Sequence, residues 1–281
     1  MRHLAALATA AALLAAATPV NGPARARDRS DTEAASRSIG WPWRGHLEGG
    51  RALTDSSRMR LLDVHREAGR FWGAQSLVAL LERASARVAA RHPGARLPIG
   101  ELSQRGGGNI HGHRSHENGL DADIGFYLRD EQGDWLAAPR FVPVNGRNGL
   151  GRFEEQTVSF DNAANWTLVE ALLTDHETPV QHLFVSRSLR RRLVAEARTR
   201  NAPASLVERL RLMLMQPGNG PRAHREHFHV RVYCPPDDRP DCRDRGPYWY
   251  WLPPDRTPNP EMFQALIGQG IRGVPLMPYP D

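Results

Sequence analysis

The sequence predicts an α+β fold in which helices pack around a small, mostly antiparallel sheet. Segments whose apolar residues have helical spacing occur together with short segments that have strand patterns, and no internal repeat is visible. A chain of 281 residues is long enough for one large domain or two small ones. We expect one folded domain, preceded and followed by segments of different composition.

The first half of the chain contains one strong helical pattern. It covers 74–91, where a single stripe holds Leu77, Leu81, Ala84 and Val88. Before it, residues 38–50 are rich in Gly, Trp and Pro and are expected to form a loop with short extended pieces. After it, strands are predicted at 97–102 and 122–128, and an edge strand at 141–144 because it contains a proline. The Gly-rich residues 145–155 are expected to form a loop.

The second half predicts three helices and two strands. The helices are expected at 161–175 with Asp161 as N-cap, at 188–198 and at 205–215. Strands are expected at 180–185 and at 227–233, where apolar and polar residues alternate. Beyond Gly246 the chain is rich in proline and aromatic residues, and we expect it to end in an extended tail. For the aromatic run 248–251, packing is favoured over contact with substrate.

The N-terminus has the pattern of a secretory signal peptide. Arg2 and His3 precede an uncharged apolar run, 4–17, and Ala24-Arg25-Ala26 has the small-x-small form of a cleavage site. We therefore expect a signal peptide at 1–26, rather than a cytosolic helix, and a disordered mature start at 27–37. No later stretch is apolar for the ~18 residues that a membrane span needs. The predicted location is the periplasm.

The charge of the chain favours an anionic partner. The formal net charge is +6, and arginine supplies all 37 basic residues because the sequence contains no lysine. An exported basic protein meets a cell wall rich in carboxylates. The arginines are dispersed and no nucleic-acid-binding module is present, so nucleic acid is not an expected partner.

Histidines gather in two short windows. Six of the 12 histidines lie within 111–116 and 224–229. Imidazoles combined with a carboxylate suit Zn²⁺. His116, Asp123 and His229 are the candidate ligands, and three protein ligands leave a fourth position open, which is typical of a catalytic site.

Local geometry explains how two distant segments could form one site. Side chains alternate faces on a strand, so His227 and His229 point one way while Phe228 points into the core. Gly119 permits a tight turn that would bring His116 and Asp123 together.

Residues next to the ligands have the types that hydrolysis requires. A hydrolase needs a base and a group that steadies the oxyanion, and His227 and His224 are placed for these roles. Asp121 could orient a ligand imidazole through its other nitrogen. His113 is either a further ligand or a neighbour of the metal, and Ser115 is expected to shape the loop through a hydrogen bond.

The two cysteines, Cys234 and Cys242, lie close together in the exported part of the chain. Export favours a disulfide between them. The alternative is a pair of thiolates that bind zinc.

The two histidine segments together resemble a known family. Ser-His-x-x-Gly-x-Asp-x-Asp at 115–123, followed by His-x-x-His-x-His at 224–229, is similar to the penicillin-insensitive murein endopeptidases. These belong to a wider group of lysostaphin, D-alanyl-D-alanine peptidase and hedgehog-like folds. Shorter similarities lie at 38–40, 106–108, 184–186 and 229–235. The resemblance implies a metallopeptidase domain at 38–245 and leaves 246–281 as a C-terminal extension.

The resemblance also implies roles for individual residues. It implies one Zn²⁺ per chain on His116, Asp123 and His229, with His113 near the metal. It implies catalytic roles for His227 and His224, and a disulfide between Cys234 and Cys242. Some members hold a second zinc through an Asp-x-x-His segment, which is not found in 145–165, so one zinc is expected.

The implied activity is cleavage of the D-alanyl to meso-diaminopimelyl cross-link in peptidoglycan by a zinc endopeptidase. The alternatives are another wall amide hydrolase (an amidase or a carboxypeptidase), a non-catalytic wall-binding module of the same fold, and a zinc-storage protein. The sequence predicts neither the oligomeric state nor the preferred cross-link.

Overall fold

The structure is a computed structural model that describes residues 35–216, 224–271 and 273–274. By its internal contacts the chain divides into two units, Met1–Glu33 and Ala34–Asp281, and the account below concerns the second. The predicted signal peptide and residues 27–34 of the predicted disordered start lie outside the described residues.

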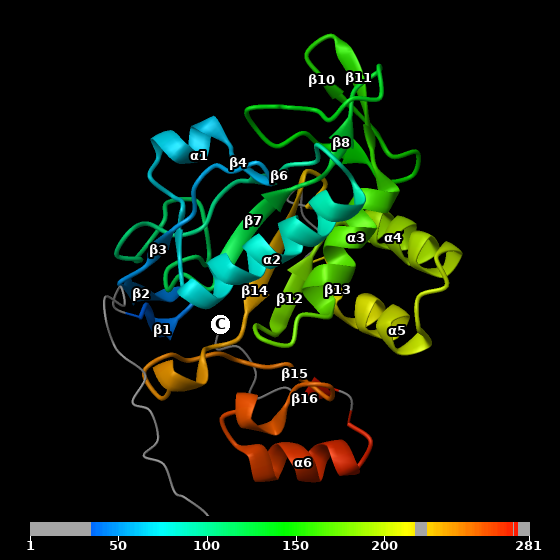
Figure 1. The fold of residues 1–281 in the computed structure, drawn as a ribbon. Coiled ribbons are helices and arrows are strands. Elements are labelled where there is room, and N and C mark those ends of the chain that lie inside the picture. The colour runs from blue at the N-terminus through cyan, green and yellow to red at the C-terminus, as the bar shows by residue number, and fades with distance from the viewer. Residues whose placement is uncertain (1–34, 217–223, 272, 275–281) are drawn as a thin grey trace, which may run out of the picture. The chain divides into compact units, whose positions relative to one another are not determined.

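A six-stranded sheet forms the centre of the fold (Figure 1). Its strands, in spatial order, are β13 (Leu214–Met215), β12 (Val180–Phe184), β14 (His227–Val232), β7 (Asp121–Gly125), β6 (Leu97–Ile99) and β4 (Met59–Leu61). The three inner pairings are antiparallel and the two outer ones are parallel. The predicted α+β fold with a mostly antiparallel sheet is therefore confirmed.

Smaller sheets surround this centre. A four-stranded antiparallel sheet has the order β8 (Leu128–Arg129), β11 (Gln156–Phe160), β10 (Leu150–Phe153) and β9 (Val144–Asn145). Three two-stranded sheets are β1 (Arg37–Trp41) with β2 (Arg44–Glu48), β3 (Arg51–Ala52) with β5 (Trp72–Gly73), and β15 (Tyr248–Trp249) with β16 (Gly273–Val274). Arg37, predicted to be disordered, opens β1.

The loop predicted at 145–155 is wrong. Residues 150–153 pair with 156–159 as an antiparallel hairpin, and the turn between them places Glu154 at φ 54°. The glycines suggested a loop, but Gly151 instead allows two backbone segments to approach closely. A Cβ at Gly151 would lie 2.5 Å from the carbonyl oxygen of Pro143. The predicted edge strand at 141–144 begins only at Val144, since Pro143 has no N–H to donate.

Six α-helices are described: α1 (Asp63–Glu67), α2 (Gln75–Arg91), α3 (Asn162–Leu173), α4 (Arg187–Thr199), α5 (Ala204–Met213) and α6 (Pro260–Gly268). The 3₁₀ turns are η1 (Pro236–Asp238) and η2 (Pro254–Arg256). The predicted helices are confirmed as α2, α3, α4 and α5, and the Asp161 carboxylate caps α3 by accepting from Ala164 N at 2.9 Å.

Helix α6 was not predicted, although Asn259 caps it by accepting from Met262 N. Its sequence lies in a stretch where frequent prolines hide the helical pattern. Helices α2 and α3 pack against each other beside the sheet, and α4 packs against α3 and α5 (Figure 1). Among the described residues, no helix is both long and apolar enough to cross a membrane.

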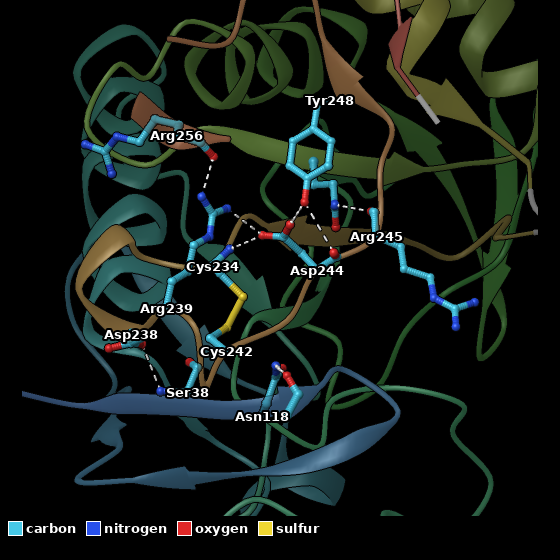
Figure 2. The surroundings of a disulfide bond; sticks show 12 residues. Ser38, Asn118, Cys234, Asp238, Arg239, Cys242, Asp244, Arg245, Tyr248 and Arg256 are labelled. Carbon is cyan, nitrogen blue, oxygen red and sulfur yellow. Dashed lines mark hydrogen bonds and ion pairs between the residues drawn. A yellow bond between two sulfur atoms is a disulfide. The ribbon is translucent and has the colours of Figure 1, made fainter. Parts of the chain in front are cut away.

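A disulfide joins Cys234 and Cys242 just beyond β14, which confirms the predicted pairing (Figure 2). The loop it closes is bound to β1: Asp238 accepts from Ser38 N at 2.9 Å, and the Asp241 carbonyl accepts from Gly40 N at 2.9 Å. Asp244 accepts a hydrogen bond from Cys234 N at 2.8 Å (Figure 2). The disulfide loop thus connects the end of the central strand to the N-terminal hairpin.

The aromatic run 248–251 packs, as predicted, at its first two residues. Tyr248 and Trp249 are buried, and Trp249 Nε1 donates to the Gln181 carbonyl at 2.9 Å. Trp251 is partly buried and stacks on Trp249 with 5.2 Å between ring centroids. These contacts attach the segment after the disulfide loop to the sheet.

Replacing Cys234 and Cys242 together by serine should lower the free energy of unfolding by about 2–3 kcal/mol, the loop-entropy value for a short loop. Urea denaturation monitored by circular dichroism measures this difference. Reducing agent should cause the same loss in the unchanged protein and none in the double variant. Two reactive thiols in denatured, unreduced protein would contradict the pairing.

Candidate metal centre

The register between β7 and β14 creates the site. Cross-strand partners are Asp123 with His229, Asp121 with Arg231, and Gly125 with His227. Because strand side chains alternate faces, the side chains of all three pairs project from the same face, except that Gly125 has none. The other face carries Phe228, as predicted, and Val230, each fully buried in the core.

Asp123 is the residue that the surrounding imidazoles share. Its Oδ1 lies 2.8 Å from His229 Nδ1 and 3.6 Å from His227 Nε2, and its Oδ2 lies 3.5 Å from His116 Nε2. Burial alone would raise the pKa of Asp123, but the three imidazoles hold it well below its usual value. The group is therefore a buried carboxylate anion.

His229 lies between two carboxylates. Its Nε2 is 2.8 Å from Asp121 Oδ1 and its Nδ1 is 2.8 Å from Asp123 Oδ1. Burial alone would lower the pKa of His229, but the hydrogen bonds with Asp121 and Asp123 raise it to about 9. Positive charge is therefore favoured at this position, and the predicted orienting role of Asp121 agrees with its contact at Nε2.

Asp121 is itself held in place by a cation. Arg231 Nε donates to Asp121 Oδ1 at 2.7 Å, and the carboxylate is fully buried. Burial would raise the pKa of Asp121, but Arg231 and His229 lower it below its usual range. The backbone N–H of His116 also donates to Asp121 Oδ2 at 3.3 Å, so this carboxylate connects both histidine segments.

His116 is strained and incompletely hydrogen-bonded. It has φ 79°, its exposed fraction is 1%, and its Nδ1 has no hydrogen-bond partner among the described residues. Burial lowers its pKa and so favours the neutral imidazole. Backbone strain and an unsatisfied buried nitrogen both mark functional positions.

The turn that returns from His116 to Asp123 depends on Gly119. Gly119 has φ 75°, and a Cβ there would lie 2.8 Å from Leu47 Cδ2 and 3.0 Å from Ala74 N. The predicted tight turn is confirmed at this glycine. Ser115 is buried beside His116, but within the described part of the chain its hydroxyl makes no hydrogen bond, so its predicted loop-shaping bond is not seen.

The residues present fit a metal ion. His113, His116 and Asp123 each offer a ligand atom, and these atoms lie within 4.8 Å of one another. His229 is outside that group but contacts Asp123 directly. Imidazole nitrogens and a carboxylate are donors that suit a divalent ion such as zinc. The nitrogen of His116 that faces Asp123 is Nε2, whose 3.5 Å separation from Asp123 Oδ2 is longer than a normal hydrogen bond and suits two ligands of one ion.

His113 has a second partner, Glu101, which the sequence did not suggest. The buried Glu101 carboxylate contacts both His113 Nε2 and Arg70 Nη1. The hydrogen bond that His113 donates to Glu101 raises the pKa of His113, which favours a protonated imidazole with no free lone pair at that nitrogen. Strand alternation could have revealed Arg231, two residues after His229, but no sequence signal indicated Glu101.

The second histidine segment reaches the same site. The His224 ring centroid lies 5.0 Å from that of His227 and 6.2 Å from that of His229, and His224 has φ 44°. His227 Nδ1 is 3.7 Å from Glu226 Oε1. The structure therefore brings together the six predicted histidine and aspartate residues nearest the centre: His113, His116, Asp123, His224, His227 and His229.

Fold and site define a class: an α+β protein with a candidate metal centre on an antiparallel sheet. The sequence profile of the family described as penicillin-insensitive murein endopeptidase matches residues 38–250. The chain belongs to this family, as its motifs predicted.

Curated relatives carry the same description at modest identity. A Haemophilus influenzae protein named penicillin-insensitive murein endopeptidase is 27% identical over 196 residues, which is 66% of this chain and 59% of that protein. An Escherichia coli protein of the same name is 28% identical over 181 residues, covering 63% and 58% respectively. This chain thus spans less than two thirds of the length of these relatives.

Replacing Asp121 by asparagine should weaken metal binding by about 10- to 100-fold, the usual effect of losing a carboxylate that orients a ligand imidazole. Titration against a fluorescent zinc chelator measures the affinity. Asp175→Asn is the matched control, because Asp175 is also paired with an arginine, Arg83, but lies outside the two histidine segments. Equal affinity of Asp121→Asn and the unchanged protein would refute this role for Asp121.

Proposed function

We propose that this protein is a zinc-dependent endopeptidase that cleaves peptide cross-links in peptidoglycan. The observation that carries the proposal is the buried cluster of His116, Asp123 and His229, with His227 and His224 beside it. Family membership gives the substrate class, because the curated relatives are named murein endopeptidases. The net charge of +6 suits an anionic wall polymer.

The donor set favours one Zn²⁺. In this proposal His116, Asp123 and His229 hold the ion, with His113 as its neighbour or a further ligand. A bound zinc of this kind activates water and polarises an amide carbonyl. Asp121 accepts the proton on Nε2 of His229, which would leave Nδ1, the nitrogen beside Asp123, available to the metal.

The remaining histidines carry the proton and steady the developing charge. His227 accepts a proton from the attacking water and returns it to the leaving amine, with Glu226 3.7 Å from its other nitrogen. His224 lies next to His227 and stabilises the oxyanion. These roles need no acylated side chain, and no serine of the two histidine segments is placed with a base to become one.

The bond cleaved is proposed to be the D-alanyl to meso-diaminopimelyl cross-link, in the periplasm, by the domain at 38–245. Mass spectrometry of digested sacculi tests the bond directly. Products that retain the cross-link but lose the sugar, or lose only a terminal residue, would instead identify an amidase or a carboxypeptidase.

Chelation should abolish cleavage of cross-linked muropeptide dimers, and one equivalent of Zn²⁺ should restore it, because the metal supplies the activated water. Benzylpenicillin should leave the rate unchanged, since β-lactams acylate an active-site serine. Liquid chromatography of the products measures both effects. Inhibition by micromolar penicillin, or full activity in the chelated protein, would contradict the mechanism.

His227→Ala should retain zinc while its rate of hydrolysis falls by about 10²–10⁴-fold, the cost of losing a general acid–base group. His229→Ala should lose both zinc and activity. Metal analysis alongside the kinetics separates the two classes of variant. The exposed His176, which lies outside the two histidine segments, provides the control His176→Ala. Wild-type turnover in His227→Ala would remove His227 from the mechanism.

A further inference from the structure

His227 and His229 are held in different ways. His229 makes a 2.8 Å hydrogen bond at each ring nitrogen. The nearest carboxylate oxygens to His227 are 3.6 Å away on Asp123 and 3.7 Å away on Glu226, which is beyond hydrogen-bond distance. Its Nδ1 is buried without a hydrogen-bond partner among the described residues. Within the described ranges, hydrogen bonds therefore do not fix the orientation of the His227 ring.

An aromatic ring covers one face of His227 instead. The Phe141 ring is stacked on it, with 4.8 Å between centroids and 26° between planes. The cross-strand partner of His227 is Gly125, which has no side chain to support the imidazole. Phe141 occupies that side, because a Cβ at Gly125 would lie 3.4 Å from Phe141 Cδ1.

Phe141 is itself fixed by its surroundings. A Cβ at Gly100 would lie 2.1 Å from Phe141 Cζ, so the ring lies directly on the Gly100 backbone. The His65 ring is 5.5 Å from the Phe141 ring. At Gly100 only a residue without a Cβ leaves room for the aromatic ring, and at Gly125 the ring lies within van der Waals distance of the backbone.

We propose that Phe141 is a positioning residue that sets the ring plane of His227 and keeps its Nε2 directed at Asp123. The proposal rests on the proposed function, in which His227 moves the proton. Stacking restricts rotation about the side-chain bonds without binding either nitrogen. The ring can therefore be ordered while both nitrogens remain available for proton transfer.

The test compares Phe141→Leu, which removes the ring, with Phe141→Tyr, which keeps it. Phe160→Leu is the matched control, because Phe160 is buried and its ring packs against Phe126, 5.2 Å away, rather than against a histidine. Each variant is loaded with zinc, and kcat and KM are measured on cross-linked muropeptide dimers. The ¹H–¹³C NMR signals of the His227 ring are recorded with and without zinc.

We expect Phe141→Leu to lower kcat by about 10- to 100-fold with little change in KM, the cost of misplacing a reacting group by about 1 Å. Zinc content should stay at one per chain, and the upfield ring-current shift of the His227 signals should disappear. Phe141→Tyr should restore most of kcat and the shift. Phe160→Leu should keep both, even where its melting temperature falls.

Three results would overturn the positioning role. A raised KM with unchanged kcat would make Phe141 a wall of the substrate site. An equal fall of kcat in Phe160→Leu would reduce the effect to general stability. Unchanged His227 signals in Phe141→Leu would show that the ring is held by other groups. If the unchanged protein does not cleave the dimers, the proposed function fails, and the NMR comparison alone decides the positioning.

Discussion

The pairing of Asp123 with His229 across β7 and β14 is the constraint on which the rest of the site depends. It sets a carboxylate and an imidazole opposite each other on one face, and by strand periodicity it also aligns Asp121 with Arg231. A slip of one residue would turn every one of these side chains to the opposite face. Phe228 and Val230 oppose such a slip, because it would expose two fully buried apolar side chains.

Structures at both ends of these strands reinforce the register. Before β7, Gly119 makes the turn that brings His116 back to Asp123, and the backbone of His116 donates to Asp121. After β14, the disulfide loop is hydrogen-bonded to β1 (Figure 2). The site is therefore built on the two central strands of the sheet, and its strained residues, His116 and His224, are on the loops that enter it, which agrees with where proteins concentrate functional strain.

Much of this was predictable because the signals are local. Helices α2 and α3 follow from apolar stripes and an Asp cap, and the common face of His227 and His229 follows from strand alternation. The hairpin β10–β11 was missed because glycines that allow a close backbone approach look like loop residues. Glu101 and Phe141 reach the histidines from outside the two histidine segments, through packing that no local pattern encodes. Their contribution therefore becomes visible only in three dimensions.

The two histidines of β14 show why a site of this kind uses both hydrogen bonds and packing. In the proposed site His229 is a metal ligand, which needs a fixed tautomer, and the carboxylate of Asp121 on Nε2 of His229 would provide one. The same kind of hydrogen bond hinders a group that must gain and lose a proton, because a carboxylate acceptor stabilises the protonated form of that group. At His227 the carboxylates stay beyond 3.5 Å and an aromatic ring restricts the side chain instead. His227 has a glycine as its cross-strand partner and His229 has an aspartate. In the proposed mechanism this difference separates the roles of the two histidines.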